Sequence, residues 1–234
     1  MSSIGLIGYG AFGKLIVHHL SAHAGFVIHD PLLPDSSTPA TALSQPVVIL
    51  AIPAQYLREF LTSHAHELNP DATYIDVCSV KVKPVEIMLE LLPDSANIIA
   101  THPLFGPASA ADSLRGRRIM THPVRVTPES YETLLRFLRS LELEIIETTP
   151  EEHDKAMAYV QGLSHYIGRI MQQMDVPETP LATRAYLDLL DMKSVQGNDS
   201  DDLFNSILHD NQYTAEVLKD FEKARTQVAT TFDV

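Results

Sequence analysis

The sequence predicts an α/β fold, in which a Rossmann-type domain with a mostly parallel sheet is followed by a smaller all-helical domain. Through the first 149 residues, short apolar runs bounded by turn residues alternate with helical patterns. Such alternation is typical of a parallel sheet that helices cover on both faces. Beyond Thr149 the strand pattern stops and only helical periodicity continues. We therefore expect a first domain over residues 1–149 and a second over residues 150–234.

The elements of the first domain are expected in a regular order. The apolar runs predict strands at residues 4–8, 26–29, 47–52, 73–77, 97–100, 119–126 and 142–147. The spacing of apolar residues predicts helices at residues 11–23, 54–68, 83–92 and 128–140. Residues 31–46 are rich in Pro, Ser and Thr and are expected to form a loop.

The second domain is expected to contain helices alone. Thr149-Pro150-Glu151-Glu152 is a capping box with proline at the first helical position. The helix that follows should run to about Met174, with one apolar face made by Ala156, Val160, Leu163, Ile167, Ile170 and Met174. Further helices are expected near residues 178–194, 200–209 and 211–232.

The composition limits the kinds of partner. A net charge of −13 argues against a nucleic-acid surface or an anionic membrane. No apolar run approaches the roughly 20 residues of a membrane span, and the first strand begins too close to Met1 for a signal peptide. The single cysteine, Cys78, excludes an internal disulfide and suits a reducing compartment. We therefore expect a cytoplasmic protein.

Three glycines near the start of the chain predict a dinucleotide site. Gly8, Gly10 and Gly13 form a G-x-G-x-x-G pattern between the first expected strand and the first expected helix. The first glycine allows a tight turn, the second lets the backbone approach a pyrophosphate, and the third lets the helix pack closely on the strand. The amides that begin the helix then face the phosphates, where the helix dipole favours negative charge.

Asp30 indicates which dinucleotide is bound. It ends the second expected strand, 17 residues after Gly13. A carboxylate at this place accepts hydrogen bonds from the adenosine ribose and repels a 2′-phosphate, so NAD is favoured over NADP. The alternative is that Asp30 only begins a turn with Pro31. We expect the cofactor to contact Gly8, Tyr9, Gly10, Ala11, Phe12, Gly13, Asp30, Ala51, Ile52 and Pro53.

His102 is the candidate catalytic base. It stands just past a predicted strand, in the segment T-H-P-L-F-G-P at residues 101–107. The carboxyl ends of parallel strands border the ligand site, and a histidine there can accept a proton near neutral pH. The alternative is a histidine that the backbone satisfies at the strand end. Ser79, in the segment D-V-C-S-V-K at residues 76–81, follows the preceding strand and is expected at the same edge of the sheet.

Several motifs together resemble the prephenate/arogenate dehydrogenase family of tyrosine biosynthesis. They are G-x-G-x-x-G, D-V-C-S-V-K, T-H-P-L-F-G-P and the later E-E-H-D and Y-V-Q-G-L-S-H, in matching order and spacing over residues 3–170. The resemblance implies NAD-dependent oxidative decarboxylation of a cyclohexadienol. NAD would accept hydride from the ring carbon that bears the hydroxyl, and CO2 would leave as the ring becomes aromatic.

The resemblance also implies roles for individual residues. His102 would polarise the ring hydroxyl and accept its proton, and Ser79 would hydrogen-bond that hydroxyl and orient His102. His165 would bind the substrate, although helical geometry alone leaves it facing either solvent or the site. Arg169, on the same helix face, and Lys81 are further candidates for contact with the small anionic substrate. No metal is needed, and no Cys/His cluster has ligand spacing.

One feature of the family is missing. The family has an arginine late in the helical domain that pairs with the ring carboxylate, and the corresponding place here carries Lys193-Ser194-Val195. Lysine does not replace a bidentate arginine, so Arg169, Arg184 or Lys193 would have to supply the charge. Two alternatives therefore stay open. One is a two-domain NAD(P)-dependent dehydrogenase or reductase of another small molecule, and the other is a non-catalytic dinucleotide-binding sensor.

The helical domain is expected to form a dimer as well as to bind substrate. Its helices carry more large apolar residues than so few helices can bury among themselves. A two-fold dimer is the commonest way to cover such a surface, and the resemblance implies the same homodimer.

Overall fold

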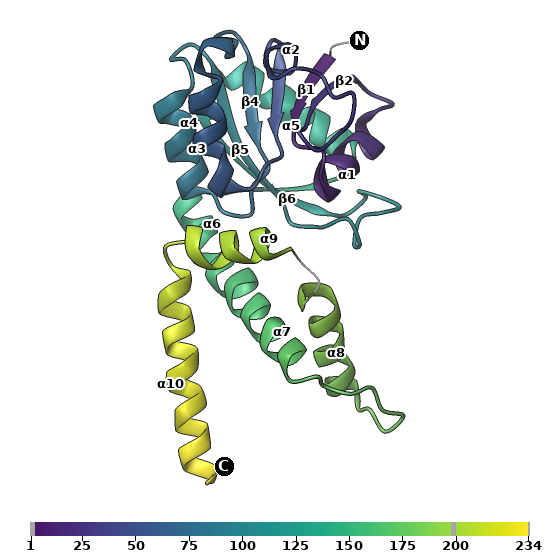
Figure 1. Ribbon diagram of the computed structural model, residues 1–234, viewed down its shortest axis with the longest axis vertical. Coiled ribbons are helices and arrows are strands. Elements are labelled where there is room, and N and C mark those ends of the chain that lie inside the picture. Colours follow the sequence, from purple (N-terminus) through teal and green to yellow (C-terminus); the bar gives the residue numbers. More distant parts are fainter. Residues whose placement is uncertain (1–2, 198–199, 234) are drawn as a thin grey trace. The chain divides into compact units, whose positions relative to one another are not determined.

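The computed structural model describes residues 3–197 and 200–233, with residues 195–197 described by their backbone alone. The chain divides into two compact units, Met1–Glu151 and Glu152–Val234. The division falls two residues after the domain boundary that the sequence predicts. Figure 1 shows the α/β unit in purple to teal and the helical unit in green to yellow.

The first unit is built on a single sheet with seven strands among its described residues. The strand order is β2-β1-β3-β4-β5-β6-β7. The first five strands are parallel, β6 runs antiparallel to β5, and β7 runs parallel to β6. The predicted fold class is confirmed, and the strands are β1 (Ser3–Ile7), β2 (Gly25–His29), β3 (Val47–Leu50), β4 (Thr73–Asp76), β5 (Asn97–Pro103), β6 (Arg118–Arg125) and β7 (Glu144–Glu147).

Helices cover both faces of this sheet (Figure 1). On one face Leu43, Leu57 and Met88 pack against Leu50 and Tyr74 of the strands, in the larger of the hydrophobic clusters. The helices on this face are α2 (Pro39–Leu43), α3 (Ala54–Ser63), followed by a 3-10 turn at Ala65–Glu67, and α4 (Val82–Leu91).

On the opposite face, Tyr131 and Leu135 pack against Ile75 and Ile99. The helices there are α1 (Ala11–Leu20) and α5 (Pro128–Ser140). Alternate residues of the buried parallel strands therefore enter two separate cores, which is why these strands read as continuous apolar runs.

The helix α2 lies in a stretch that the sequence predicts as loop, so that prediction is wrong for residues 39–43. The Thr38 hydroxyl accepts a hydrogen bond from the Thr41 amide, and Pro39 occupies the first turn. Both features favour a helix start. Ala42 and Leu43 are fully buried, so one short turn of helix covers the sheet where a solvated loop was expected.

The order of the first three strands creates a topological switch point. Strands β2 and β3 lie on opposite sides of β1. In open parallel sheets, ligands bind outside the carboxyl ends of the strands at such a point. The glycine motif follows β1 and residues 51–53 follow β3, so the fold brings both candidate cofactor segments to this place.

The strand β5 is longer than the sequence predicts and contains His102. Strand β4 pairs with β5 only as far as Asp76 opposite Ala100. Beyond that pair, β6 supplies the partner, with His102 opposite Met120. The prediction that His102 stands just past a strand is therefore wrong, because an antiparallel neighbour extends the pairing by three residues.

The second unit contains helices and π-helical turns among its described residues. One of its predicted helices, at 178–194, begins only at Arg184, because Pro177 and Pro180 bias the residues before them away from helical geometry. No helix among the described residues is both long and apolar enough to cross a bilayer. The elements that begin at residue 150 are α6 (Pro150–Met157), a π-helix (Ala158–Leu163), α7 (Ser164–Gln173), α8 (Arg184–Gly197), α9 (Asp201–Asn205), a second π-helix (Ser206–Asp210) and α10 (Thr214–Phe232).

The first π-helix changes which residues of the long helix are buried, so the predicted apolar face is wrong. Val160 and Met174, expected on its apolar face, are 60% and 68% exposed, whereas Gly162 and His165 are buried. A π-helix winds more slowly than an α-helix, so spacing at 3.6 residues per turn fails across it. A side chain on Gly162 would press on Thr214 of α10, so the slow turn also lets the two helices approach closely.

Candidate functional site

The glycine turn has the shape that a dinucleotide requires. Gly8 has φ of +97°, and a Cβ there would overlap the carbonyl oxygen of Ala51. A Cβ on Gly13 would overlap the Gly8 carbonyl, whereas a Cβ on Gly10 would meet no atom within 4 Å. The first and third glycines are thus required by the protein itself, and the second leaves open space beside the backbone. This is the division of roles that the motif predicts.

The first turn of α1 is suited to an anion. Gly10 forms the N-cap without a side-chain hydrogen bond, and no acidic residue lies in the first turn. The first amides of a helix lack partners within the helix and carry the positive end of its dipole. The amides of Ala11, Phe12 and Gly13 therefore fit a pyrophosphate.

Asp30 binds the glycine turn directly. One carboxylate oxygen accepts a hydrogen bond from the Tyr9 amide at 2.6 Å, and the other accepts from the Leu32 amide at 2.8 Å. Asp30 therefore begins a turn, as the alternative interpretation held, and at the same time sits at the carboxyl end of β2 beside the glycine motif. Each carboxylate oxygen can accept a further bond, so the arrangement remains compatible with a ribose.

The loop between β5 and β6 is held against α1 at two points. The rings of Phe12 and Phe105 lie 6.3 Å apart. Nε2 of His19 lies 2.7 Å from the carbonyl oxygen of Ala110, and since a carbonyl only accepts, this nitrogen carries the proton. Phe105 is three residues from His102, so these contacts bring the strand end that carries the histidine to the helix that begins at the glycine turn.

Lys81 lies in the interior of the unit. Its side chain is fully buried, and its ammonium pairs with the fully buried carboxylate of Asp76. It also donates to the carbonyl oxygen of Thr101 at 2.5 Å. We expected Lys81 among the residues that bind substrate, but these contacts give the ammonium partners within the protein.

Ser79 and His102 both follow the last register pair of β4 and β5, Asp76 opposite Ala100. Ser79 is partly buried and His102 is 3% exposed. The two candidate catalytic residues thus belong to adjacent segments at the same end of the sheet, as parallel pairing requires.

In the helical unit, His165 and Arg169 lie one helical turn apart on α7. His165 is buried, and this burial, with a smaller contribution from the Arg169 charge, lowers its pKa to about 4. Arg169 lies 4.5 Å from the ring centroid of Phe204 and donates to the exposed carboxylate of Asp201 at 3.0 Å. Helical geometry alone leaves His165 facing either solvent or the site, and the structure excludes solvent, because the residue is buried where the π-helix has shifted the phase of the helix.

The other two candidates for the missing cation bind groups within the unit. Lys193 donates to the Val176 carbonyl oxygen at 2.9 Å. Arg184 pairs with Asp188 one turn later on the same helix, and both side chains are largely exposed.

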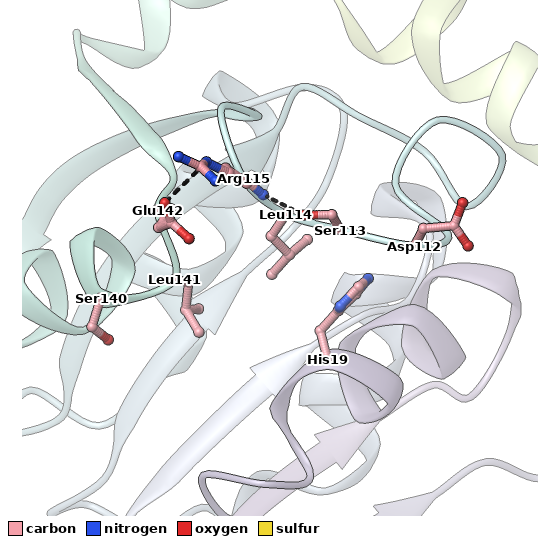
Figure 2. A pocket seen from close by; sticks show the side chains of 8 residues that line it. All are labelled: His19, Asp112, Ser113, Leu114, Arg115, Ser140, Leu141 and Glu142. Atoms are coloured by element: carbon pink, nitrogen blue, oxygen red, sulfur yellow. Dashed lines mark hydrogen bonds and ion pairs between the residues drawn. The ribbon is translucent and has the colours of Figure 1, made fainter.

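A hollow of about 260 Å³ lies elsewhere on the first unit. Figure 2 shows His19 on one side of it and the ion pair of Arg115 with Glu142 on the other. Its lining comes from the far end of α1, the loop after β5 and the turn after α5, and includes none of the residues expected to bind cofactor or substrate. We therefore do not assign the hollow to the predicted site.

Comparison with known proteins identifies the family. The prephenate dehydrogenase nucleotide-binding domain matches residues 33–147, and the TYRAAT1-like C-terminal domain matches residues 170–233. Arogenate dehydrogenase 1, chloroplastic, and arogenate dehydrogenase 2, chloroplastic, of Arabidopsis thaliana are 28% and 27% identical to the chain, each over 94% of it. The chain belongs to the prephenate/arogenate dehydrogenase family.

This prephenate/arogenate dehydrogenase family member covers only part of some of its relatives. It spans 38% of the length of the first Arabidopsis protein and 67% of the second. The crystal structure of prephenate dehydrogenase from A. aeolicus, in complex with hydroxyphenyl propionate and NAD+, covers 99% of the chain at a TM-score of 0.74 and 19% identity, with 91% of that chain covered. Synechocystis arogenate dehydrogenase covers 99% at a TM-score of 0.69 and 21% identity, with 92% of that chain covered. These likenesses show the fold.

The sequence does not predict roles for Asp76, Thr101 and Phe105 of this family member, which make the contacts described above. Asp76 and Lys81 stand five residues apart in D-V-C-S-V-K, a segment in which only the serine and the lysine are predicted as site residues. A carboxylate at the end of a buried strand, followed closely by a lysine, was the available signal, since charged residues are rarely buried without a partner.

Proposed function

We propose that this chain catalyses the NAD-dependent oxidative decarboxylation of prephenate or arogenate in tyrosine biosynthesis. The family supports this, and one observation within the structure carries it. The Phe12–Phe105 contact ties the strand end bearing His102 to the helix that begins at the glycine turn. This contact supports a site in which the proposed base lies near the bound dinucleotide, as removal of a hydride from the ring carbon and of a proton from its hydroxyl oxygen requires.

The residues of the first unit would act on the substrate hydroxyl. NAD, when bound, supplies the hydride acceptor. In this proposal, His102 accepts the proton of the ring hydroxyl and Ser79 hydrogen-bonds the same oxygen. Aromatisation supplies a large driving force, so the protein has only to hold the reacting carbons at roughly 3–3.5 Å and manage one proton.

His165 and Arg169 would bind the anionic substrate. With its pKa lowered to about 4, His165 is neutral at pH 7 and would act as a hydrogen-bonding group. Arg169 would supply the charge. One of its partners, Asp201, has a side chain that is 85% exposed, so a substrate carboxylate can compete with this carboxylate for the guanidinium.

NAD is the cofactor that we propose, in preference to NADP, because the Asp30 carboxylate is anchored beside the glycine turn. A 2′-phosphate brought to that place would meet a fixed negative charge. We also propose a cytoplasmic protein, on the grounds of its single cysteine.

We further propose that the helical unit forms an isologous dimer. Large apolar side chains there are exposed, among them Met174 at 68%, Leu181 at 87% and Phe232 at 70%. Sedimentation at micromolar concentration should show a dimer, and a monomer alone under these conditions would contradict the proposal.

Turnover tests the activity directly. The purified chain is mixed with NAD and prephenate, with NAD and arogenate, and with NAD alone, and NADH absorbance and CO2 release are followed. Equal amounts of NADH and CO2 with one of the two substrates support the proposal. NAD binding without turnover on either substrate would contradict it.

A second candidate function follows from the missing arginine. The Lys193 ammonium is engaged by the Val176 carbonyl oxygen, so this lysine makes a poor clamp for the ring carboxylate. This favours a two-domain dehydrogenase or reductase that acts on another small molecule. Turnover of a different hydroxyl or imine substrate, with prephenate and arogenate inert, would support this alternative. Dinucleotide binding without turnover of any substrate would support the alternative of a non-catalytic dinucleotide-binding sensor.

A further inference from the structure

The segment that carries Ser79 is joined to the strand that carries His102 by a buried polar cross-link. Beyond Ala100, β5 has no partner strand on its β4 side among the described residues. Lys81 donates to the Thr101 carbonyl oxygen at 2.5 Å, and the Thr101 hydroxyl donates to the Asp76 carbonyl oxygen at 2.6 Å. These two bonds continue the connection between the segments beyond the last strand pair.

The charges of the cross-link depend on each other. Lys81 and Asp76 are both fully buried. One oxygen of Asp76, Oδ2, accepts from Lys81 and from the Cys78 amide, while Oδ1 is buried without a hydrogen-bond partner within the described residues. A buried carboxylate with one oxygen lacking a hydrogen-bond partner requires a nearby cation to offset its desolvation, and a buried ammonium requires an anion for the same reason.

We propose that Lys81 and Asp76 are positioning residues that hold His102 in register with Ser79. The inference rests on the proposed function and adds to it a role for two residues that touch neither substrate nor cofactor. Lys81 fixes the carbonyl of the residue immediately before His102, and Asp76 fixes Lys81 and the amide just before Ser79. A purely structural pair would instead serve only to neutralise two charges in the core.

A charge-neutral double variant separates the two roles. Lys81→Met alone leaves Asp76 as an uncompensated buried charge and is expected to lower the melting temperature or prevent folding. Combining Lys81→Met with Asp76→Asn removes both charges while keeping side chains of similar size. We expect this double variant to fold, with a melting temperature close to that of the wild type and NAD affinity within about twofold, because neutralised pairs are often tolerated.

The predicted loss is in turnover. With the Thr101 carbonyl released, kcat of the double variant should fall at least about tenfold while KM changes little, since small misplacements of catalytic groups can cost up to about 10²-fold. Thr101→Val, which removes the second bond, should lower kcat in the same direction. Thr121→Val is the matched control. Thr121 is the register partner of Thr101 and equally buried, but its hydroxyl bonds to Tyr131.

A measurement that does not depend on turnover tests the positioning role separately from the proposed reaction. The ring signal of His102, assigned in NMR spectra by comparison with His102→Gln, should shift or broaden in the double variant and stay in place in Thr121→Val. Wild-type kcat in the double variant, or an unchanged His102 signal, would overturn the positioning role. If the wild type has no activity on prephenate or arogenate, the proposed function fails, and the NMR comparison still decides the inference.

Discussion

The Asp30 carboxylate accepts a hydrogen bond from the Tyr9 amide at 2.6 Å, so the residue proposed to select the cofactor also anchors the glycine turn. The second strand and the phosphate-binding turn are thereby fixed relative to each other. Under the proposal that Asp30 selects NAD, cofactor selection and the stability of the turn depend on the same side chain.

Replacing Asp30 tests this double role. Asp30→Ser should raise affinity for NADP, because the charge that repels a 2′-phosphate is removed. It should also weaken NAD binding several-fold, because the turn loses its anchor. Dissociation constants for both cofactors, from protein fluorescence or calorimetry, measure the effect. Asp35→Asn is the control, since Asp35 is exposed and at φ of 62°, where asparagine is tolerated. Unchanged NADP affinity in Asp30→Ser would exclude Asp30 as the selector.

The glycines should separate stability from binding. Gly10→Ala should leave the melting temperature nearly unchanged, because its Cβ meets no protein atom within 4 Å, while NAD affinity falls at least about tenfold, since a pyrophosphate must approach this backbone. Gly13→Ala should instead destabilise the fold by about 1–3 kcal/mol, as overpacking does, because its Cβ overlaps the Gly8 carbonyl. Thermal melts with and without NAD distinguish the two. Equal NAD affinity in Gly10→Ala and wild type would remove the dinucleotide from this turn.

Removing the proposed base should affect chemistry alone. His102→Asn is expected to keep NAD affinity and to reduce kcat by the roughly 10²–10⁴-fold typical of a lost general base. Steady-state kinetics on the better of the two substrates, with NAD titrations alongside, measure this. His66→Asn is a suitable control because the His66 side chain is 80% exposed. A kcat within about twofold of wild type would show that the proton goes to another group.

The buried His165 should make stability depend on pH. Its folded pKa of about 4 lies below the ordinary value of 6.5, so the unfolded chain binds a proton more readily and stability falls as the pH drops from about 6.5 towards 4. Between pH 7.5 and pH 5, protonation of this residue should lower the free energy of unfolding by about 2 kcal/mol. Urea unfolding at the two pH values should show a smaller loss in His165→Gln. His209→Gln, at an exposed histidine of the same unit, should behave as the wild type. An equal loss in wild type and His165→Gln would contradict the lowered pKa.

Much of the first unit could be predicted because its signals are local. The apolar runs predict the central parallel strands, since a buried parallel strand must be apolar on both faces. The glycine turn could be predicted for a related reason. Gly8 and Gly13 stand where another part of the backbone comes too close for a side chain. The G-x-G-x-x-G motif places glycines at these positions along the chain, so it can be found from the sequence.

The sequence by itself thus determined the strands, the glycine turn and the family, because each is recorded in residues close together along the chain. Tertiary structure alone decided that β5 continues through His102, because β6, which pairs there, is separated from it by a long loop. It also decided that Lys81 is buried, since the partners of its ammonium come from two different strands. The inward position of His165 has the same origin. The π-helix shifts the phase of the helix and packs closely on α10. A helical pattern read at 3.6 residues per turn cannot predict that shift.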